Sequence, residues 1–411
     1  MSVDAIILAG GKGTRLKSVV SDVPKPMALV NKRPFISYLL DQLIDFGVED
    51  AYLSVGYRHD VIMSYFGNRY KSIRLHYVVE DEPLGTGGGI RLACETANSD
   101  DVLILNGDTF FNADLQSLIS THKNSDATMT IALKQMDQVN RYGMVELSNS
   151  VISAFTEKTE ELKDGLINAG MYVINRKQFL DSTEAGVFSM EKDYMEKRVT
   201  DGVVFGKELE GYFIDIGIPN DYHLANGYFL FKGLKINRSW TLFLDRDGVI
   251  NKRLIDDYVK NLQEFEWLEN VPQTIVRFSE IFGRVLVVTN QQGIGKGLMT
   301  ESDLQEVHDF INDEVTSRGG RIDKFYHCPD LKTKVNNCRK PNPAMGLQAK
   351  EDFPEIDFRK SVMVGDSVSD MEFGRALGMY TLFISPKSDE FDAKLTHFVT
   401  TNLSDFTSIL Q

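Results

Sequence analysis

Short apolar runs recur along the chain, separated by longer segments with helical periodicity. Examples lie at residues 5–8, 102–105, 241–244, 285–288 and 362–364, and Gly, Asp or Asn bounds them. A short apolar run is typical of a strand buried on both faces, and a periodic segment between two such runs is typical of a covering helix. The pattern therefore predicts an α/β fold built on parallel sheets.

This pattern stops once and then starts again. Residues 222–231 have the periodicity of a helix, residues 232–238 are basic with little periodicity, and a new strand begins at Trp240. A chain of 411 residues is also longer than one hydrophobic core usually organises. We therefore predict two domains, 1–233 and 239–411, whose motifs differ.

The composition, 42% hydrophobic and 25% charged residues, is that of an ordinary globular protein. The formal net charge of -14 argues against general binding to nucleic acid, which depends on cationic side chains. No apolar stretch is long enough to span a bilayer, and three cysteines are too few for a disulfide framework. We therefore expect a cytoplasmic protein with no nucleic-acid or membrane partner.

A glycine-rich loop follows the first strand, in the segment from Leu8 to Leu16. Its three glycines allow backbone N–H groups to approach an anion, and Lys12 and Arg15 add positive charge. The loop lacks the end of a P-loop and the spacing of a dinucleotide fingerprint. The glycines taken alone are more typical of an ordinary turn between strand and helix.

Other features in the first half favour a phosphate site. Lys25 lies between two prolines, which limits the entropy lost when its ammonium binds an anion. A second glycine-rich segment covers residues 84–89, Asp108 follows a buried strand, and Asp215 lies near the end of the domain. Ligands of open α/β sheets bind at such strand ends, so these residues are candidates for one site.

These motifs and their order resemble the sugar-1-phosphate nucleotidyltransferases over residues 1 to about 230. The resemblance implies a Rossmann-like mixed sheet, and a nucleoside triphosphate and a sugar phosphate as ligands. It implies that Arg15 and Lys25 contact the reacting phosphates and that Asp108 and Asp215 hold Mg²⁺. It places the nucleotide on Leu8, Gly10, Gly11, Gly13, Thr14, Gly85 and Gly107, and the sugar phosphate on Glu157, Lys158, Asn168 and Gly170.

The second half contains two aspartates at the end of a predicted strand. Asp245 and Asp247 are one residue apart, so an extended backbone points both carboxylates the same way. The fragment could also belong to a calcium loop, but the further acidic ligands of that loop are missing. Thr289 and Asp366 follow at the ends of later strands and Lys340 follows in a loop, where a phosphotransferase needs them.

These four segments resemble the motifs of the haloacid dehalogenase superfamily in their expected order, which implies a parallel α/β sandwich. By that resemblance Asp245 attacks phosphorus, Asp247 is the general acid and base, and Thr289 and Lys340 hold the phosphoryl oxygens. Asp370 would orient Lys340. The remaining implied roles are Mg²⁺ binding by Asp245, Asp247 and Asp366, and substrate binding by Asn290 and Arg339.

Within that superfamily, the second half resembles the heptose 1,7-bisphosphate phosphatases and their histidinol-phosphatase relatives. The first half resembles the guanylyltransferases for the heptose phosphate, which implies GTP as the donor. Two alternatives stay open: another sugar 1-phosphate, of mannose or N-acetylmuramate, or a regulatory sensor without turnover. The sequence does not determine the anomer of the sugar. It does not determine the oligomeric state either, and a homo-oligomer stays an open alternative.

The related phosphatases usually carry a structural zinc loop before the segment that begins at Cys338. Here Cys328 and Cys338 are present, but Asp330 and Asn336 stand where other ligands are expected. Two thiolates without sulfur or imidazole partners make a poor closed zinc site, although His327 is an alternative ligand. We therefore expect no obligatory zinc, with the two thiols acting as small hydrophobes.

Overall fold

The computed structural model describes residues 3–11, 23–139, 142–156, 163–255, 257–385, 391–392 and 394–410. The chain divides into two compact units, Met1–Tyr222 and His223–Gln411. Helix α7, Pro219–Gly233, contains the point of division, so the second unit begins before the boundary that the sequence pattern indicates.

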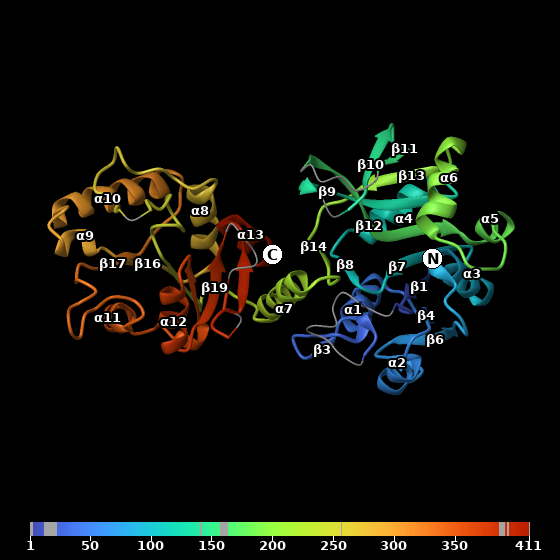
Figure 1. Ribbon diagram of the computed structural model, residues 1–411, viewed down its shortest axis with the longest axis horizontal. Helices are drawn as coiled ribbons and strands as arrows, with labels where there is room; N and C mark the ends of the chain where they lie inside the picture. Colours follow the sequence, from blue (N-terminus) through green and yellow to red (C-terminus); the bar gives the residue numbers. More distant parts are fainter. Residues whose placement is uncertain are drawn as a thin grey trace. The chain divides into compact units, whose positions relative to one another are not determined.

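A ten-stranded mixed sheet forms the centre of the first unit (Figure 1). β1 pairs in parallel with β4 and β7, whereas β12 is antiparallel to β7 and β9. In sheet order the strands are β10 (Met144–Ser148), β11 (Val151–Thr156), β13 (Val204–Glu208), β9 (Met129–Val139), β12 (Lys163–Asn175), β7 (Asp101–Asn106), β1 (Asp4–Leu8), β4 (Asp50–Val55), β6 (Ile73–Val79) and β5 (Arg69–Tyr70).

Helices and two small sheets complete this unit. The small sheets pair β2 (Leu29–Val30) with β3 (Arg33–Pro34), and β8 (Thr109–Phe111) with β14 (Phe213–Asp215). The helices are η2 (Lys25–Met27), α1 (Ile36–Phe46), α2 (His59–Phe66), α3 (Gly85–Thr96), α4 (Leu115–Lys123), α5 (Arg176–Asp181), η3 (Met190–Met195), α6 (Glu196–Arg198) and η4 (Val199–Asp201).

The second unit is built on a six-stranded, fully parallel sheet. Figure 1 shows α8 and α10 on one side of this sheet and α11 and α12 on the other. The strand order is β17 (Lys324–Cys328), β16 (Arg284–Asn290), β15 (Thr241–Leu244), β18 (Ser361–Gly365), β19 (Tyr380–Ile384) and β20 (Phe398–Thr400). The helices are α8 (Val271–Ile281), α9 (Gln292–Gly295), α10 (Glu301–Ser317), α11 (Ala344–Asp352), η5 (Phe358–Lys360), α12 (Val368–Ala376) and α13 (Leu403–Ile409).

Each sheet carries its own hydrophobic core. In the first unit, Ile6, Tyr52 and Ile104 from neighbouring strands belong to one cluster of buried side chains. In the second unit, Phe243 and Met363 belong to another. Strands buried on both faces explain the continuous apolar runs of the sequence, and the α/β fold class is confirmed.

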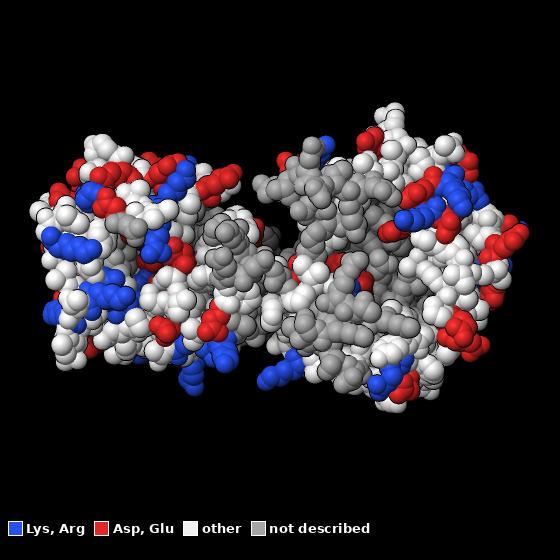
Figure 2. Space-filling model, viewed as in Figure 1, with Lys and Arg blue, Asp and Glu red and all other residues white. Residues whose placement is uncertain are grey.

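The charged side chains on the described surface are distributed as the net negative charge of the sequence leads us to expect. On the face shown in Figure 2, acidic and basic side chains are interspersed and do not gather into one broad basic area. Within the described residues, no helix combines the length and the apolar character needed to cross a membrane.

Candidate active sites

Two strand ends meet at the base of a cleft in the first unit. β1 ends at Leu8, which lies opposite Asn106, the last residue of β7. Gly107 N donates to Leu8 O at 2.9 Å, and a Cβ at residue 107 would lie only 2.3 Å from that oxygen. Glycine is therefore required for this close approach of the two strand ends.

The cleft has a volume of about 720 Å³, which is in the range of small-molecule sites. The structure brings together much of the predicted nucleotide site: Leu8, Gly10, Gly11, Lys25, Gly85, Gly107 and Asp108 all line the cleft. The predicted residues Gly13, Thr14, Arg15, Glu157 and Lys158 lie outside the described residues.

Lys25 joins the two acidic positions of this site. Its Nζ lies 2.5 Å from Asp108 Oδ2 and 3.3 Å from Asp215 Oδ1. Burial lowers the pKa of Lys25, but the two carboxylates outweigh this effect and the pKa is raised overall. Burial and the charge of Asp108 raise the pKa of Asp215. The carboxylates of Asp108 and Asp215 therefore face the same position, and the ammonium group of Lys25 lies there and offsets their negative charge.

Asp108 and Asp215 fit a Mg²⁺ site by their chemistry and placement. Mg²⁺ prefers oxygen ligands and is usually held by one or two carboxylates together with substrate phosphates. The two side chains come from different segments, after β7 and at the end of β14, and the β8–β14 pairing opposes Asp215 to Thr109. The fit supports the predicted metal role of both residues, which stays a prediction.

Asn168 and Gly170 form a bulge in β12 beside the cleft. The β9–β12 register shifts between Asn168 and Tyr172, and Gly170 N donates to Asn168 Oδ1 at 2.9 Å. Gly170 has φ +69°, and a Cβ there would lie 2.7 Å from Asn106 Nδ2. Since Asn106 lines the cleft, the bulge lies beside the cleft, and its contact with a sugar stays a prediction.

The second site lies at the carboxyl ends of β15, β16 and β18. Asp245, Asp247, Thr289, Asn290, Arg339 and Asp366, all predicted from the sequence, line one cavity of about 330 Å³. Lys340 lies beneath them, because its Nζ is 2.9 Å from Asp245 Oδ1, 2.5 Å from Asp370 Oδ1 and 2.7 Å from Val288 O. Asp370 thus contacts Lys340, as the resemblance implies.

Three carboxylates crowd the inner end of this cavity. Oxygens of Asp245, Asp366 and Asp370 lie within 4.8 Å of one another. Burial and the charge of Asp370 raise the pKa of Asp245 to about 8 and that of Asp366 to about 6. A divalent cation would offset this repulsion, so the oxygen donors fit Mg²⁺. The structure groups Asp370, rather than the side chain of Asp247, with the other two acids.

Asp247 is instead held by polar side chains that the sequence prediction gave no role. Arg246, fully buried, donates to both carboxylate oxygens, with Nη2 at 2.9 Å from each. Asn251 Nδ2 and Gln291 Nε2 each donate from 2.9 Å. Burial raises the pKa of Asp247, but Arg246 and these amides outweigh it and lower the pKa overall. In the sequence, the only indication that Arg246 belongs to this site is its position between the two predicted aspartates.

Asn290 and Thr289 are fixed at the end of β16. Asn290 Nδ2 donates to Lys340 O at 3.2 Å, and Lys340 N donates to Asn290 Oδ1 at 2.9 Å. Thr289 Oγ1 accepts from Gln291 Nε2 at 2.9 Å. Asn290 therefore positions the loop that carries Lys340, a role beyond its predicted contact with substrate.

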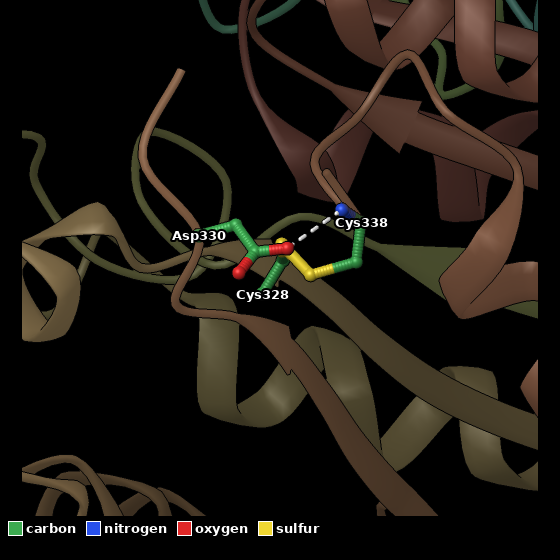
Figure 3. A group of neighbouring side chains, drawn as sticks. All are labelled: Cys328, Asp330 and Cys338. Atoms are coloured by element: carbon green, nitrogen blue, oxygen red, sulfur yellow. Dashed lines mark hydrogen bonds between the residues drawn. A yellow bond between two sulfur atoms is a disulfide. The ribbon is translucent and has the colours of Figure 1, made fainter. Parts of the chain in front are cut away.

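Cys328 and Cys338 are joined by a disulfide, with Cα atoms 5.6 Å apart (Figure 3). Cys328 ends β17, and Cys338 immediately precedes Arg339. Asp330 Oδ2 accepts from Cys338 N at 3.1 Å. The prediction that the thiols behave as separate small hydrophobes is therefore wrong: they cross-link the ends of the loop. Thiolates are the zinc ligands, so bonded sulfurs would have to be reduced before they could bind that metal.

The folds and the two sites define a nucleotidyltransferase joined to a phosphatase domain of the haloacid dehalogenase type. Residues 4–230, more than half of the chain, match the nucleotidyl transferase family profile. The chain therefore belongs to the nucleotidyl transferase family. Residues 337–405 match a HAD-hydrolase-like profile and lie within the second unit. Both resemblances seen in the sequence are confirmed.

The similar proteins described next each match just over half of the chain. The D-glycero-alpha-D-manno-heptose 1-phosphate guanylyltransferase of Aneurinibacillus thermoaerophilus is 44% identical over 223 residues, covering 54% of this chain and 96% of that protein. An enzyme of the same name from Campylobacter jejuni is 39% identical over 222 residues, covering 54% and 97%. The crystal structure of HddC from Yersinia pseudotuberculosis is 36% identical, with a TM-score of 0.51, and covers 55% of this chain and 99% of that one.

Proposed function

We propose that the chain carries out two consecutive steps in the synthesis of GDP-D-glycero-α-D-manno-heptose. The second unit removes the 7-phosphate of D-glycero-α-D-manno-heptose 1,7-bisphosphate. The first unit then transfers GMP from GTP to the heptose 1-phosphate and releases pyrophosphate. The observation that carries this proposal is the 44% identity to a heptose 1-phosphate guanylyltransferase in a chain that also holds a phosphatase site.

In the first unit, an oxygen of the sugar phosphate attacks the α-phosphorus of GTP, and the bond from that phosphorus to the departing pyrophosphate breaks. Both reactants are anions, so the protein must neutralise charge and align the groups in line. Lys25 supplies a buried positive charge at the cleft. Mg²⁺ on Asp108 and Asp215 would supply further neutralisation of the phosphates, and no protein nucleophile is needed.

The choice of GTP is supported by the acidic lining of the cleft. Glu80 and Asp81 line it beside Gly10 and Gly85. Glu80 accepts from Ser54 Oγ at 2.7 Å and from Leu84 N at 3.0 Å, so its carboxylate is held in place. The N1–H and 2-amino groups of guanine are donors that carboxylates accept, whereas uracil offers a single donor on its pairing edge.

In the second unit, a carboxylate oxygen of Asp245 attacks the phosphorus of the substrate, and the bond from phosphorus to the sugar oxygen breaks. Asp247 gives its proton to the departing alkoxide, and later removes a proton from the water that cleaves the aspartyl-phosphate. The negative charge of a bound phosphate raises the pKa of Asp247 for the acid step. Its lowered pKa in the free site, caused mainly by Arg246, suits the later base step. Mg²⁺ held by Asp245 and Asp366 would reduce repulsion between the nucleophile and the phosphate.

A direct test supplies the purified chain with heptose 1-phosphate and each of the four nucleoside triphosphates. We expect GTP to be used at least about tenfold faster than ATP, CTP or UTP, a preference worth about 1.4 kcal/mol or more. Mannose 1-phosphate and N-acetylmuramate 1-phosphate serve as alternative acceptors. Faster use of another base or of another sugar would refute the assignment of the first unit.

A further inference from the structure

A buried histidine of the second unit has no function in the reaction described above. His308 lies on α10 and is 3% exposed. Its ring stacks on that of Phe325 in β17, with ring centroids 4.5 Å apart and an interplanar angle of 20°. Phe325 pairs with Val287 of β16, the strand that also carries Thr289. Packing therefore holds the imidazole of His308 close to the strand that contributes to the phosphatase site.

The Nε2 atom of His308 is a buried polar atom without a partner. None of the described residues forms a hydrogen bond with it. Burial, with the positive charge of Arg246, lowers the pKa of His308 to about 3, so the imidazole is neutral at neutral pH. A neutral imidazole carries its proton on one ring nitrogen and accepts a hydrogen bond at the other. Because a buried acceptor without a donor costs free energy, Nε2 is a place where a donor would be stabilised.

Arg246 has the complementary donor. Its Nε and Nη2 bind Asp247 Oδ1 at 3.2 Å and 2.9 Å, whereas its Nη1 is buried and has no partner in the described part of the chain. The side chain of Arg246 is 0% exposed, so bulk solvent does not reach Nη1. His308 interacts electrostatically with both Arg246 and Asp247. An unpaired donor and an unpaired acceptor therefore lie in the same buried region behind Asp247.

Two other buried acceptors in this region already have a role. Asn251 Oδ1 and Gln291 Oε1 also lack partners among the described residues, but the amide nitrogen of each side chain donates to Asp247 from 2.9 Å. These two side chains therefore hold the carboxylate directly. No hydrogen bond joins His308 to Asp247 within the described residues, so the effect of His308 on that carboxylate has to pass through Arg246.

We propose that His308 is a positioning residue for the general acid of the phosphatase: its Nε2 accepts a hydrogen bond from Arg246 Nη1, directly or through one internal water, and so fixes the guanidinium that holds Asp247. This inference rests on the proposed function and adds a supporting residue to it. His308 contacts neither the substrate nor the phosphorus. A guanidinium that is bound on both sides keeps its orientation, and the carboxylate that it holds keeps the geometry needed for proton transfer.

The leaving group of the substrate makes this role measurable. The alkoxide of a sugar is a strong base that needs a proton from Asp247 as it departs, whereas p-nitrophenolate is a weak base that departs without one. The value of kcat/KM includes only the steps up to the departure of this group, so the later hydrolysis of the aspartyl-phosphate does not affect it. A misplaced Asp247 should therefore lower kcat/KM for a sugar phosphate much more than for an aryl phosphate.

The test compares kcat/KM for heptose 1,7-bisphosphate with kcat/KM for p-nitrophenyl phosphate. His308→Phe keeps a ring on Phe325 but removes the acceptor, and we expect it to lower the ratio of the sugar value to the aryl value about tenfold or more. His308→Gln places a carboxamide oxygen near the position of Nε2 and should restore most of the ratio. Val315→Ala is the matched control, because Val315 is buried on the same helix and has no polar side-chain atom. Its ratio should equal the native one.

The outcomes separate this inference from the proposed function. An unchanged ratio in His308→Phe, or a ratio in His308→Gln as low as in His308→Phe, would overturn the role of His308 and leave the proposed function standing. Suppose instead that native enzyme ignores the heptose bisphosphate but hydrolyses fructose 1,6-bisphosphate, and that only His308→Phe lowers the ratio measured with that sugar. The role of His308 would then stand and the heptose assignment would fall. Native enzyme inactive on all of these phosphates, or an Asp247→Asn variant that loses sugar and aryl phosphate equally, would overturn both.

Discussion

The buried ammonium of Lys340 allows a quantitative prediction about stability. Its side chain is 1% exposed and lies against Asp245 and Asp370, whose side chains are 12% and 0% exposed. Lys340→Met keeps a similar side-chain length but leaves two buried carboxylates without their cation. Removal of one partner from a buried ion pair typically costs about 3–5 kcal/mol.

The structure indicates the lower part of that range at neutral pH. The pKa of Asp245 is already raised to about 8 by burial and by Asp370, so Asp245 can take up a proton when the ammonium is lost. We therefore expect Lys340→Met to lower the free energy of unfolding of the second unit by about 3 kcal/mol. Adding Asp370→Asn should recover about 1–2 kcal/mol, because it removes one of the unpaired charges but keeps the oxygen that accepts from Ser367.

Tryptophan fluorescence during urea unfolding measures this effect in the correct unit. The chain has two tryptophans, Trp240 and Trp267, and both belong to the second unit. Lys332→Met is the control for loss of a lysine charge, and nucleotidyl transfer reports on the first unit. A loss below 1 kcal/mol in Lys340→Met, or a double variant less stable than the single one, would refute the account of two carboxylates balanced by one cation.

The remaining predictions concern chemistry, pH and metal. Asp245→Asn should lower phosphate release by about 10³-fold or more while nucleotidyl transfer from supplied sugar 1-phosphate is retained; appreciable hydrolysis by the variant would exclude Asp245 as the nucleophile. Asp215→Ala should lower nucleotidyl transfer by about 100-fold or more without changing phosphatase turnover, and an unaltered Mg²⁺ dependence of transfer would remove Asp215 from the metal site. Burial, with the charges of Arg246 and His327, lowers the pKa of His308 to about 3, so the folded unit loses stability as the pH falls below 6.5, where the unfolded chain binds the extra proton. In His308→Phe, the free energy of unfolding measured by fluorescence should therefore fall less steeply with decreasing pH. An unchanged pH dependence would count against this linkage. Elemental analysis of protein purified without chelator should find well below one zinc per chain, and one tightly held zinc whose removal abolishes phosphatase activity would contradict the reading of the loop 328–338.

The sequence predicted best the residues that follow buried parallel strands. Leu8, Asp108, Asp245 and Asp366 each lie at or just after a strand end, and neighbouring parallel strands end at the same edge of a sheet. The pattern of apolar runs alone therefore predicts that Leu8 and Asp108 converge in the first unit and, separately, that Asp245 and Asp366 converge in the second. Roles beyond placement came from resemblance to the two families.

Residues in loops were harder to predict, because sequence spacing does not determine where a loop returns. Cys328 and Cys338 are ten positions apart in the sequence, and this spacing gave no indication that their Cα atoms lie 5.6 Å apart. Strand alternation separates Arg246 from Asp247, yet the buried guanidinium turns back to bind that carboxylate. More than thirty residues separate Tyr258 from Lys296 in the sequence, yet Lys296 Nζ lies 5.2 Å from the centre of the Tyr258 ring.

The most direct measurement incubates the native chain with heptose 1,7-bisphosphate, GTP and Mg²⁺ and identifies the products by mass spectrometry. We expect GDP-heptose with one inorganic phosphate and one pyrophosphate per molecule formed. The Asp245→Asn variant should make no GDP-heptose from the bisphosphate but should make it from heptose 1-phosphate. A GDP-sugar that keeps its second phosphate, or phosphate release with no GDP-heptose formed, would contradict the assignment of two consecutive steps to this chain.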